Sequence, residues 1–202
     1  MGKYFYENRS LAKRSQIPDH FVDALLATED IRFRKHSGID FKALARAVFG
    51  ALTFSKQSGG ASTITQQLSK MLFTKQPASG LGRVKQKLKE WIIALRLERR
   101  YTKDEILTMY LNRFDWVNNA VGIKSASKVY FNKNVENLSI NEGAMFVGML
   151  KNPSLFNPNR RLEKTQQRRN IVLSQMKKYN FIDDSTYNSV SYTHLTLPTI
   201  YS

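Results

Sequence analysis

The sequence contains no cysteine among its 202 residues. This absence excludes disulfide bonds, thiolate metal sites and a cysteine nucleophile. Long apolar runs are missing as well. A membrane-spanning helix needs roughly 18 or more apolar residues, whereas the longest candidate, 144–150, is one short stretch. The opening residues 1–10 lack the apolar segment of a signal peptide. We therefore expect neither a spanning helix nor an export signal within this sequence.

Acidic residues are scarce. There are 16 Asp and Glu against 32 Lys and Arg, which gives a net charge of +16. A field this positive favours anionic partners (nucleic acid, an anionic membrane surface or a phosphorylated substrate), and charge alone does not choose among them. The cations concentrate in 83–100, with seven against two acidic residues, and in 151–178, with eight against one.

Apolar residues recur at helical spacing along most of the chain and strand signals are weak, so we predict a mainly α fold. One helix is expected from Pro18 to about Glu29, one after Asp40 as N-cap, a long one between 66 and 102, and one over 162–179. The side chains expected on their buried faces are Phe21, Val22, Leu25 and Leu26; Phe41, Leu44, Ala45, Val48 and Phe49; Val84, Leu88, Trp91, Ile92 and Leu95; and Ile171, Val172 and Met176.

Local signals mark where helices begin and where loops lie. Three pairs have the spacing of capping boxes, namely Thr63 with Gln66, Thr102 with Glu105, and Ser139 with Glu142. Glycine and proline predict loops at 55–61, 76–82 and 151–160. The end of the chain, 191–202, is rich in Thr and Tyr without helical period, and we interpret it as a non-native tail.

Glu29 and Asp30 stand where an apolar helix face is expected to end. A carboxylate at the edge of an apolar surface can have a raised pKa, which suits a general acid or base near neutral pH. The alternative is a structural salt bridge to Arg32 or Arg34. The three histidines, His20, His36 and His194, show no metal-ligand spacing and are expected to be structural or incidental.

A polar run, 59–67, leads into a predicted helix N-terminus, where free backbone N–H groups favour an anion. It is not a Walker A motif, because no Gly-Lys-Ser/Thr follows, and the alternative is an ordinary capped helix. On the long helix, Lys87, Glu90 and Ala94 share one face that is not the apolar stripe. This face holds either a carboxylate presented with cations to a phosphorylated substrate or a solvent-exposed ion pair.

Five short patterns occur in order between 17 and 184. They are Glu29-Asp30-x-x-Phe33-x-x-His36-x-Gly38-Ile39-Asp40; Gly60-Ala61-Ser62-Thr63-Ile64-Thr65-Gln66-Gln67-Leu68; Lys87-x-x-Glu90-x-x-x-Ala94; Tyr110-Leu111-Asn112 with Gly122 and Tyr130-Phe131; and Glu142-x-Ala144 leading to Pro153 and Asn157-Pro158. Together they resemble the peptidoglycan glycosyltransferase family, found in monofunctional transglycosylases and in class A penicillin-binding proteins.

The resemblance implies a mainly α, lysozyme-like, two-lobed helical domain with a small membrane-facing lobe. It also implies polymerisation of lipid II onto a growing glycan strand, by inverting transfer with release of undecaprenyl pyrophosphate. By motif position Glu29 corresponds to the general base and Glu90 to the second carboxylate. The positions that the resemblance connects with substrate and pyrophosphate are Arg46, Ser62, Gln66, Lys70, Lys87 and Lys89.

The same resemblance sets expectations about the surroundings of the domain. We expect an N-terminal flank at 1–16 after a missing membrane helix, the transferase domain at 17–184, a linker at 185–190 and the tail at 191–202. A transpeptidase domain is expected in a longer, bifunctional protein at the outer face of the cell membrane. No cofactor is required, although a divalent cation, Mg or Mn, could accompany the pyrophosphate. Membrane contact is expected through Phe49, Leu52, Phe54, Met71, Leu72 and Phe73.

Some positions depart from the family pattern: Gln86 replaces a usual Arg, Met71 a common Asn and Ala61 a common Gly. Two other classes of function fit part of the pattern. A lysozyme-like hydrolase or lytic transglycosylase would also use a carboxylate but does not explain the polar run or the cation-rich second carboxylate. A nucleic-acid-binding domain explains only the charge, and we expect no nucleic-acid partner.

Overall fold

The computed structural model describes residues 11–53, 62–73 and 80–192. Within them the chain forms nine α-helices and no strand, apart from an isolated bridge between Asp115 and Val121. The helices are α1 (Asp19–Glu29), α2 (Phe41–Leu52), α3 (Ile64–Phe73), α4 (Gly80–Arg100), α5 (Lys103–Arg113), α6 (Ile123–Phe131), α7 (Ile140–Leu150), α8 (Leu162–Lys178) and α9 (Asp184–Tyr192). The predicted mainly α fold is confirmed.

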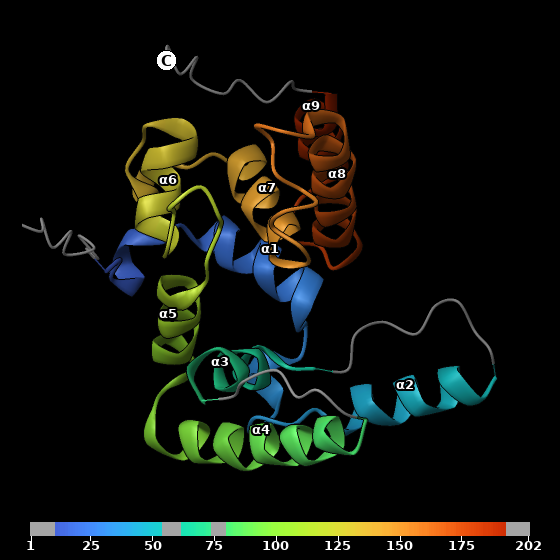
Figure 1. The fold of residues 1–202 in the computed structure, drawn as a ribbon. Helices are drawn as coiled ribbons and strands as arrows, with labels where there is room; N and C mark the ends of the chain where they lie inside the picture. The colour runs from blue at the N-terminus through green and yellow to red at the C-terminus, as the bar shows by residue number, and fades with distance from the viewer. Residues whose placement is uncertain (1–10, 54–61, 74–79, 193–202) are drawn as a thin grey trace, which may run out of the picture.

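The helices are arranged in two lobes (Figure 1). Helices α2, α3 and α4 make up what we call the small lobe, in which α3 packs on α4. Helices α1 and α6 to α9 make up the large lobe, and α5 runs between the two, in contact with both α3 and α6. The C-terminal end of α1 points from the large lobe toward the small one. The residue that ends α1 therefore lies at the junction of the lobes.

The large lobe contains the main core. Helix α7 is apolar on every side and is buried along its whole length against α1 and α8, which is the pattern of a central helix. The stripe predicted for α1, Phe21, Val22, Leu25 and Leu26, is buried as expected, and so are Val172 and Met176 of α8. Phe146 of α7 is the centre of a cluster of rings, with Phe21, Trp116, Tyr130 and Phe131 around it.

Most predicted helix starts are confirmed. Asp40 accepts hydrogen bonds from the N–H groups of Lys42 and Ala43, and the capping boxes at 102–105 and 139–142 are complete. The box at 63–66 is only half formed. The Thr63 hydroxyl accepts from the N–H of Gln66, but the Gln66 amide donates to the carbonyl of Gly38. The amide therefore ties α3 to the segment before α2.

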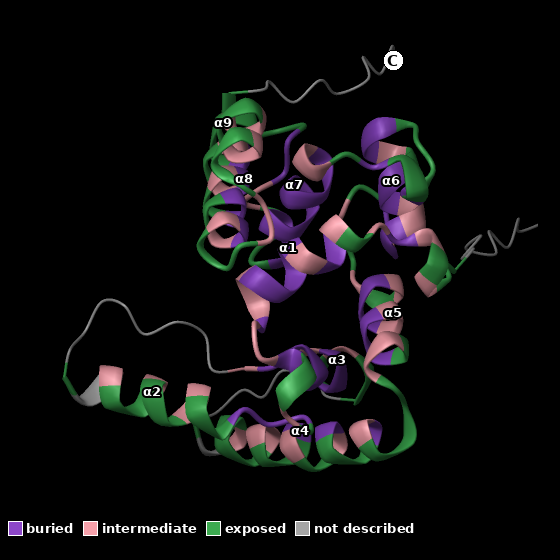
Figure 2. Ribbon diagram, turned by 180° about the vertical axis from the view of Figure 1, so that it is seen from behind, coloured by how far each residue is buried: buried purple, intermediate pink, exposed green. Residues whose placement is uncertain are grey.

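The prediction of which faces are buried is wrong for α2 and α4. Phe49 of α2 is 71% exposed and Val84 of α4 is 61% exposed. Figure 2 shows that much of α2 and α4 is coloured as exposed. The residues of α4 that are buried are instead Glu90, Ala94 and Leu97, which face α3. Other side chains predicted as inward-facing but exposed are Phe41, Ala45, Val48, Leu88, Ile92 and Leu95. The cause is the thinness of the small lobe: α4 packs on α3 and on the start of α5 and leaves its other faces open, and α2 has no extensive contact with another helix among the described residues.

Two boundaries and the burial of one residue also differ from expectation. Residues 185–190, predicted as a linker, lie inside α9, which begins because Asp183 accepts from the N–H of Thr186 and which packs Tyr187 and Val190 on the core. Helix α4 already begins at Gly80, inside a predicted loop. Ile171, predicted as core, is exposed. The predicted loop at 55–61 and most of the tail lie outside the described residues.

Candidate active site

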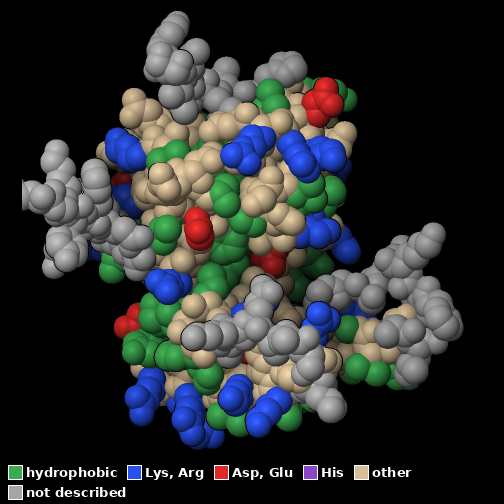
Figure 3. Space-filling view, in the orientation of Figure 1, with side chains coloured by type: hydrophobic (Ala, Val, Ile, Leu, Met, Phe, Trp, Pro, Cys, Tyr) green, Lys and Arg blue, Asp and Glu red, His purple; other side chains and the backbone are tan. Residues whose placement is uncertain are grey.

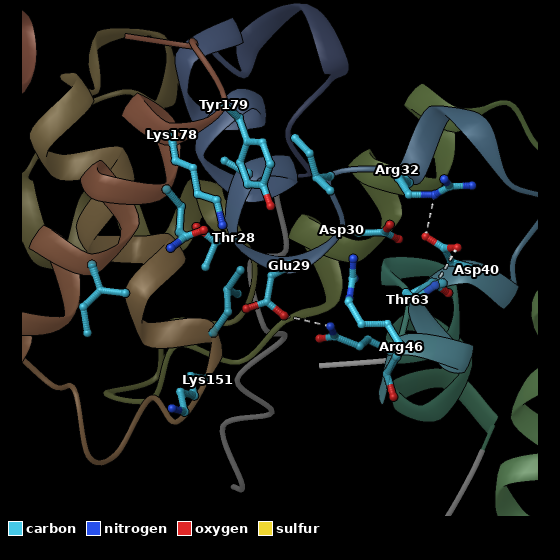
Figure 4. A pocket seen from close by; sticks show the side chains of 18 of the residues that line it. Thr28, Glu29, Asp30, Arg32, Asp40, Arg46, Thr63, Lys151, Lys178 and Tyr179 are labelled. Atoms are coloured by element: carbon cyan, nitrogen blue, oxygen red, sulfur yellow. Dashed lines mark hydrogen bonds and ion pairs between the residues drawn. The ribbon is translucent and has the colours of Figure 1, made fainter. Parts of the chain in front are cut away.

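A cleft of about 1010 Å³ opens between the lobes at the C-terminal end of α1. Figure 4 shows Glu29 near its middle, with Lys178 and Tyr179 from the end of α8 on one side and Arg46 and Thr63 on the other. Its lining is Ala27, Thr28, Glu29, Asp30, Ile31, Arg32, Asp40, Ala43, Arg46, Ser62, Thr63, Gln67, Leu150, Lys151, Arg168, Ile171, Gln175, Lys178 and Tyr179. Of the predicted site residues, Glu29, Arg46 and Ser62 meet here.

Glu29 does not form the structural salt bridge that was the alternative to a chemical role. Its Oε2 accepts a hydrogen bond from Nε2 of Gln67 at 2.9 Å. Arg32 pairs instead with Asp40 and Arg34 with Asp104. The other carboxylate oxygen of Glu29 has no hydrogen-bond partner among the described residues. One face of this carboxylate is thus anchored by α3, and the other is directed to the cleft.

Asp30, next to Glu29 in the chain, has a structural role. Both of its oxygens lie 3.0 Å from Nε2 of His36, and Oδ2 also accepts from the backbone N–H of Ile64 at 3.1 Å. The N–H of Gly38 donates to Nδ1 of His36, which leaves Nε2 as the ring nitrogen that faces Asp30. His36 is therefore structural, as predicted. The anion at the N-terminus of α3 is the chain's own Asp30 carboxylate, not the ligand that the polar run predicted.

Glu90 is neither exposed nor in the cleft lining. It is 4% exposed and accepts from Gln86 Nε2 at 3.0 Å and from Lys87 Nζ at 3.1 Å. Lys87 Nζ also donates to the Ser62 hydroxyl at 2.9 Å, and Ser62 lines the cleft. Glu90 thus connects to the cleft through two side chains. Gln86, one of the departures from the family pattern, supplies a donor to the second carboxylate.

The remaining predicted residues lie around the cleft. Gln66 is a buried residue of α3, and its Oε1 has no hydrogen-bond partner within the described part of the chain. Lys70 and Lys89 are exposed, on α3 and α4. The structure therefore brings together Glu29, Arg46 and Ser62 in the lining, joins Lys87 and Glu90 to them through Ser62, and leaves Gln66, Lys70 and Lys89 outside the lining.

One cation of the lining is already neutralised. Arg32 Nε lies 2.9 Å from Asp40 Oδ2. Burial acts to raise the pKa of Asp40, but the N–H donors of Ala43 and Lys42 and the Arg32 charge outweigh it and lower the pKa. The cleft cations that form no ion pair among the described residues are Arg46, Lys151, Arg168 and Lys178. These four are placed to bind an anionic ligand.

Reasoning from sequence missed Lys151, Arg168, Lys178 and Gln67. The first three come from the loop after α7 and from α8, more than 120 residues beyond Glu29. The cation density of 151–178 was the signal that could have found them. Burial lowers the pKa of the Arg168 guanidinium, and the negative charge of Glu29 acts in the opposite direction. The far wall of the cleft is therefore cationic and close enough to Glu29 for the charges to interact.

No group of three or more His, Asp or Glu side chains that could hold a metal ion occurs among residues 11–53, 62–73 and 80–192. No helix in the described part of the chain is long and apolar enough to cross a bilayer.

Comparison with known proteins gives consistent matches. The Transglycosylase family model matches residues 1–177. The chain is 39% identical over 182 residues to penicillin-binding protein 1F of Bacillus subtilis, and 40% identical over 188 residues to penicillin-binding protein 1A of Escherichia coli. These alignments cover 90% and 93% of this chain, and 25% and 22% of the relatives. The chain thus spans about a quarter of their length.

A solved structure supports the fold. The crystal structure of penicillin-binding protein 1A from Haemophilus influenzae superposes with a TM-score of 0.55 at 22% identity, covering 92% of this chain and 18% of that one. At this identity the likeness concerns the fold alone. The mainly helical, lysozyme-like architecture expected from sequence is confirmed by it.

Proposed function

Because the chain belongs to the transglycosylase family, we propose that it is a peptidoglycan glycosyltransferase that polymerises lipid II into glycan strands. The observation that carries the proposal is the Glu29 carboxylate, held by Gln67 on one side and directed on the other into a cleft with four cations that form no ion pair within the described residues. A base opposite cations fits a reaction in which a hydroxyl attacks and a pyrophosphate leaves.

In this reaction Glu29 accepts the proton of the acceptor's 4-hydroxyl as that oxygen attacks the anomeric carbon of the growing strand. The bond from that carbon to the undecaprenyl pyrophosphate breaks, and the configuration inverts. No covalent intermediate with the protein is needed, so positioning and charge stabilisation carry the catalysis. We place the pyrophosphate among the cleft cations and the Ser62–Lys87–Glu90 chain. A Mg²⁺ or Mn²⁺ ion could arrive with the diphosphate.

The domain boundaries and the rest of the protein belong to the same proposal. The relatives are penicillin-binding proteins about four times as long as the matched region. We propose that the transferase domain expected at 17–184 extends through α9, which packs on the core. We also propose that the full-length protein carries a transpeptidase domain at the outer face of the cell membrane.

One experiment separates this function from the runner-up, a lysozyme-like hydrolase or lytic transglycosylase that the family match does not favour. The protein is incubated with lipid II and, separately, with polymeric glycan. Consumption of lipid II with growth of strands supports the proposal. Cleavage of the glycan with lipid II untouched would replace it by the hydrolase.

The cleft cations should bind a lipid-linked pyrophosphate. We expect Lys151→Glu to weaken binding of a non-reactive lipid pyrophosphate by about 10- to 100-fold, since a hydrogen bond to a charged group contributes about 1.5–3 kcal/mol. Titration calorimetry or fluorescence anisotropy measures this affinity. Lys164→Glu on α8, outside the cleft, makes the same change in net charge and is the control.

Lys70→Glu tests the ligand assignment made from the motif. A loss with Lys70→Glu and none with Lys151→Glu would move the diphosphate from the cleft to the surface of α3. Equal losses with all three variants would reduce the effect to overall charge.

We propose that the small lobe contacts the membrane peripherally. Its outward faces combine exposed apolar side chains with cations, and Figure 3 shows Lys and Arg side chains along the edge formed by α4. The predicted contacts Phe49, Leu72 and Phe73 are exposed, and Met71 is half-buried; Leu52 and Phe54 lie outside the residues whose side chains are described. The α4 side chains Val84, Leu88, Ile92 and Leu95 add exposed apolar surface to the same lobe.

Binding to anionic vesicles should fall only partly between low and high salt, because screening weakens the charges but not inserted apolar groups. The double variant Phe49→Ser, Phe73→Ser is expected to lower the salt-resistant partitioning about 10²- to 10⁴-fold, as each buried Phe contributes about 1.5–3 kcal/mol. The matched control is Leu11→Ser, Leu162→Ser, which removes exposed apolar side chains outside the small lobe. Complete loss of wild-type binding at high salt would show that nothing inserts.

A further inference from the structure

Three side chains joined by two hydrogen bonds lead from the cleft into the core. The Tyr110 hydroxyl of α5 donates to Oε1 of Gln67 on α3 at 2.9 Å, and Nε2 of Gln67 donates to Oε2 of Glu29 at 2.9 Å. Tyr110 is completely buried. Sequence analysis identified Tyr110 only as part of a motif, and the proposed reaction does not use it.

The Tyr110 hydroxyl determines which group donates and which accepts in these two hydrogen bonds. Burial raises the pKa of its hydroxyl well above the ordinary value, and the nearby charge of Glu29 raises it further. The hydroxyl therefore keeps its proton, and can donate it, at neutral pH. A glutamine amide can present either its oxygen or its NH₂ group to a partner. Because Tyr110 donates to the amide oxygen, the NH₂ group is turned toward Glu29.

The opposite amide orientation would place the Gln67 oxygen against the Glu29 carboxylate. Two acceptors would then face each other, and Glu29 could relieve the repulsion only by taking up a proton. A protonated Glu29 cannot accept the proton of an attacking hydroxyl. The orientation of one amide group thus separates a competent base from an incompetent one.

We propose that Tyr110 is a positioning residue for the general base, acting through Gln67. It fixes the amide so that Glu29 keeps a hydrogen-bond donor on Oε2 and its other oxygen is left for the acceptor hydroxyl. This inference rests on the proposed function of Glu29 as base.

Other charged groups also face Glu29 and are unchanged by a substitution at Tyr110. Arg168 of α8 acts on it electrostatically, and Arg46 of α2, Lys151 and Lys178 line the same cleft. These four are cationic, and the two acidic residues that also line the cleft, Asp30 and Asp40, are paired with His36 and Arg32. None of these groups depends on the amide orientation. The contribution of Tyr110 is accordingly a graded one.

The test is Tyr110→Phe, with polymerisation of lipid II measured from pH 5 to 9. We expect kcat to fall about 5- to 20-fold with KM within about twofold, and the acid limb of the pH–rate profile to move to higher pH. The acid limb moves because the ionised Glu29 carboxylate is no longer assured of a hydrogen bond from the Gln67 amide.

Tyr130→Phe is the matched control. Tyr130 is also buried, its hydroxyl donates to the Trp116 carbonyl at 2.7 Å, and its pKa is raised to about 12, mainly by burial. That variant loses a comparable hydrogen bond away from the cleft and should leave the pH profile unchanged. A profile unchanged in Tyr110→Phe, or moved equally in both variants, would overturn the proposal.

Gln67→Met supplies a second arm. If Tyr110 acts through Gln67, adding Tyr110→Phe to Gln67→Met should cost no further activity, whereas independent roles would add. A readout without substrate keeps the proposed function separate. In ¹³C NMR of the protein alone, the titration midpoint of the Glu29 carboxyl should rise in Tyr110→Phe. If the midpoint rises but the protein does not polymerise lipid II, the positioning role of Tyr110 is retained and the proposed function is rejected.

Discussion

Replacement of Glu29 by glutamine is expected to lower the rate of lipid II polymerisation by about 10²- to 10⁴-fold, the usual contribution of a positioned general base. The amide keeps the shape of the side chain and an oxygen that can accept from Gln67 Nε2, as Glu29 Oε2 now does. Thermal unfolding should therefore be nearly unchanged. The assay is strand formation from lipid II, with kcat and KM determined separately.

Glu163→Gln is the control for that substitution, because it removes an exposed carboxylate of α8 outside the cleft and should leave the rate as it is. Near-normal turnover in Glu29→Gln, with the fold intact, would exclude Glu29 as the base.

A large loss of stability is expected from Gly38→Ala. Gly38 has φ of +92°, and a Cβ added there would lie 3.0 Å from the carbonyl carbon and oxygen of Ala94. Left-handed backbone costs a non-glycine residue about 1–3 kcal/mol, and a forced contact in packed structure costs a similar amount. We expect the free energy of unfolding to fall by about 2–4 kcal/mol, measured by denaturant titration.

This substitution should reduce activity as well. The Gly38 carbonyl accepts from the Thr63 hydroxyl and the Gln66 amide, so displacement of Gly38 from α4 would disturb the start of α3. Gly80→Ala is the matched control, because a Cβ at Gly80 meets nothing within 4 Å. If Gly38→Ala changes the free energy of unfolding as little as Gly80→Ala does, the backbone at Ala94 can move to accommodate the added Cβ and the prediction is wrong.

The helices could be predicted from the sequence because their caps and periodicity are local. Asp40, Thr102 and Ser139 mark true helix starts, and the stripe of α1 is buried as its pattern predicts. Periodicity locates an apolar face but not what covers it. On α4 the covered face is the one with Glu90 and Ala94, where Thr65 of α3 donates to Glu98 and Gly38 lies against Ala94.

The candidate site could be predicted only where motif and geometry coincide. Glu29, Arg46 and Ser62 come from segments that lie close together in the sequence and meet in the cleft. Arg168 and Lys178 join them because α8 packs on α1, a long-range contact that no local pattern specifies. Glu90 was found by its motif, but its burial under Lys87 and Gln86 depends on side-chain directions known only from the structure.

The bond between Glu29 and Gln67 crosses from one lobe to the other. Glu29 ends a helix of the large lobe, while Gln67 belongs to the small lobe. A hydrogen bond of this length is lost when its ends separate by about an ångström. Rotation of one lobe against the other would consequently break the hydrogen bond from Gln67 to the Glu29 carboxylate without unfolding either helix. The hydrogen bonding of the Glu29 carboxylate is thereby coupled to the width of the cleft.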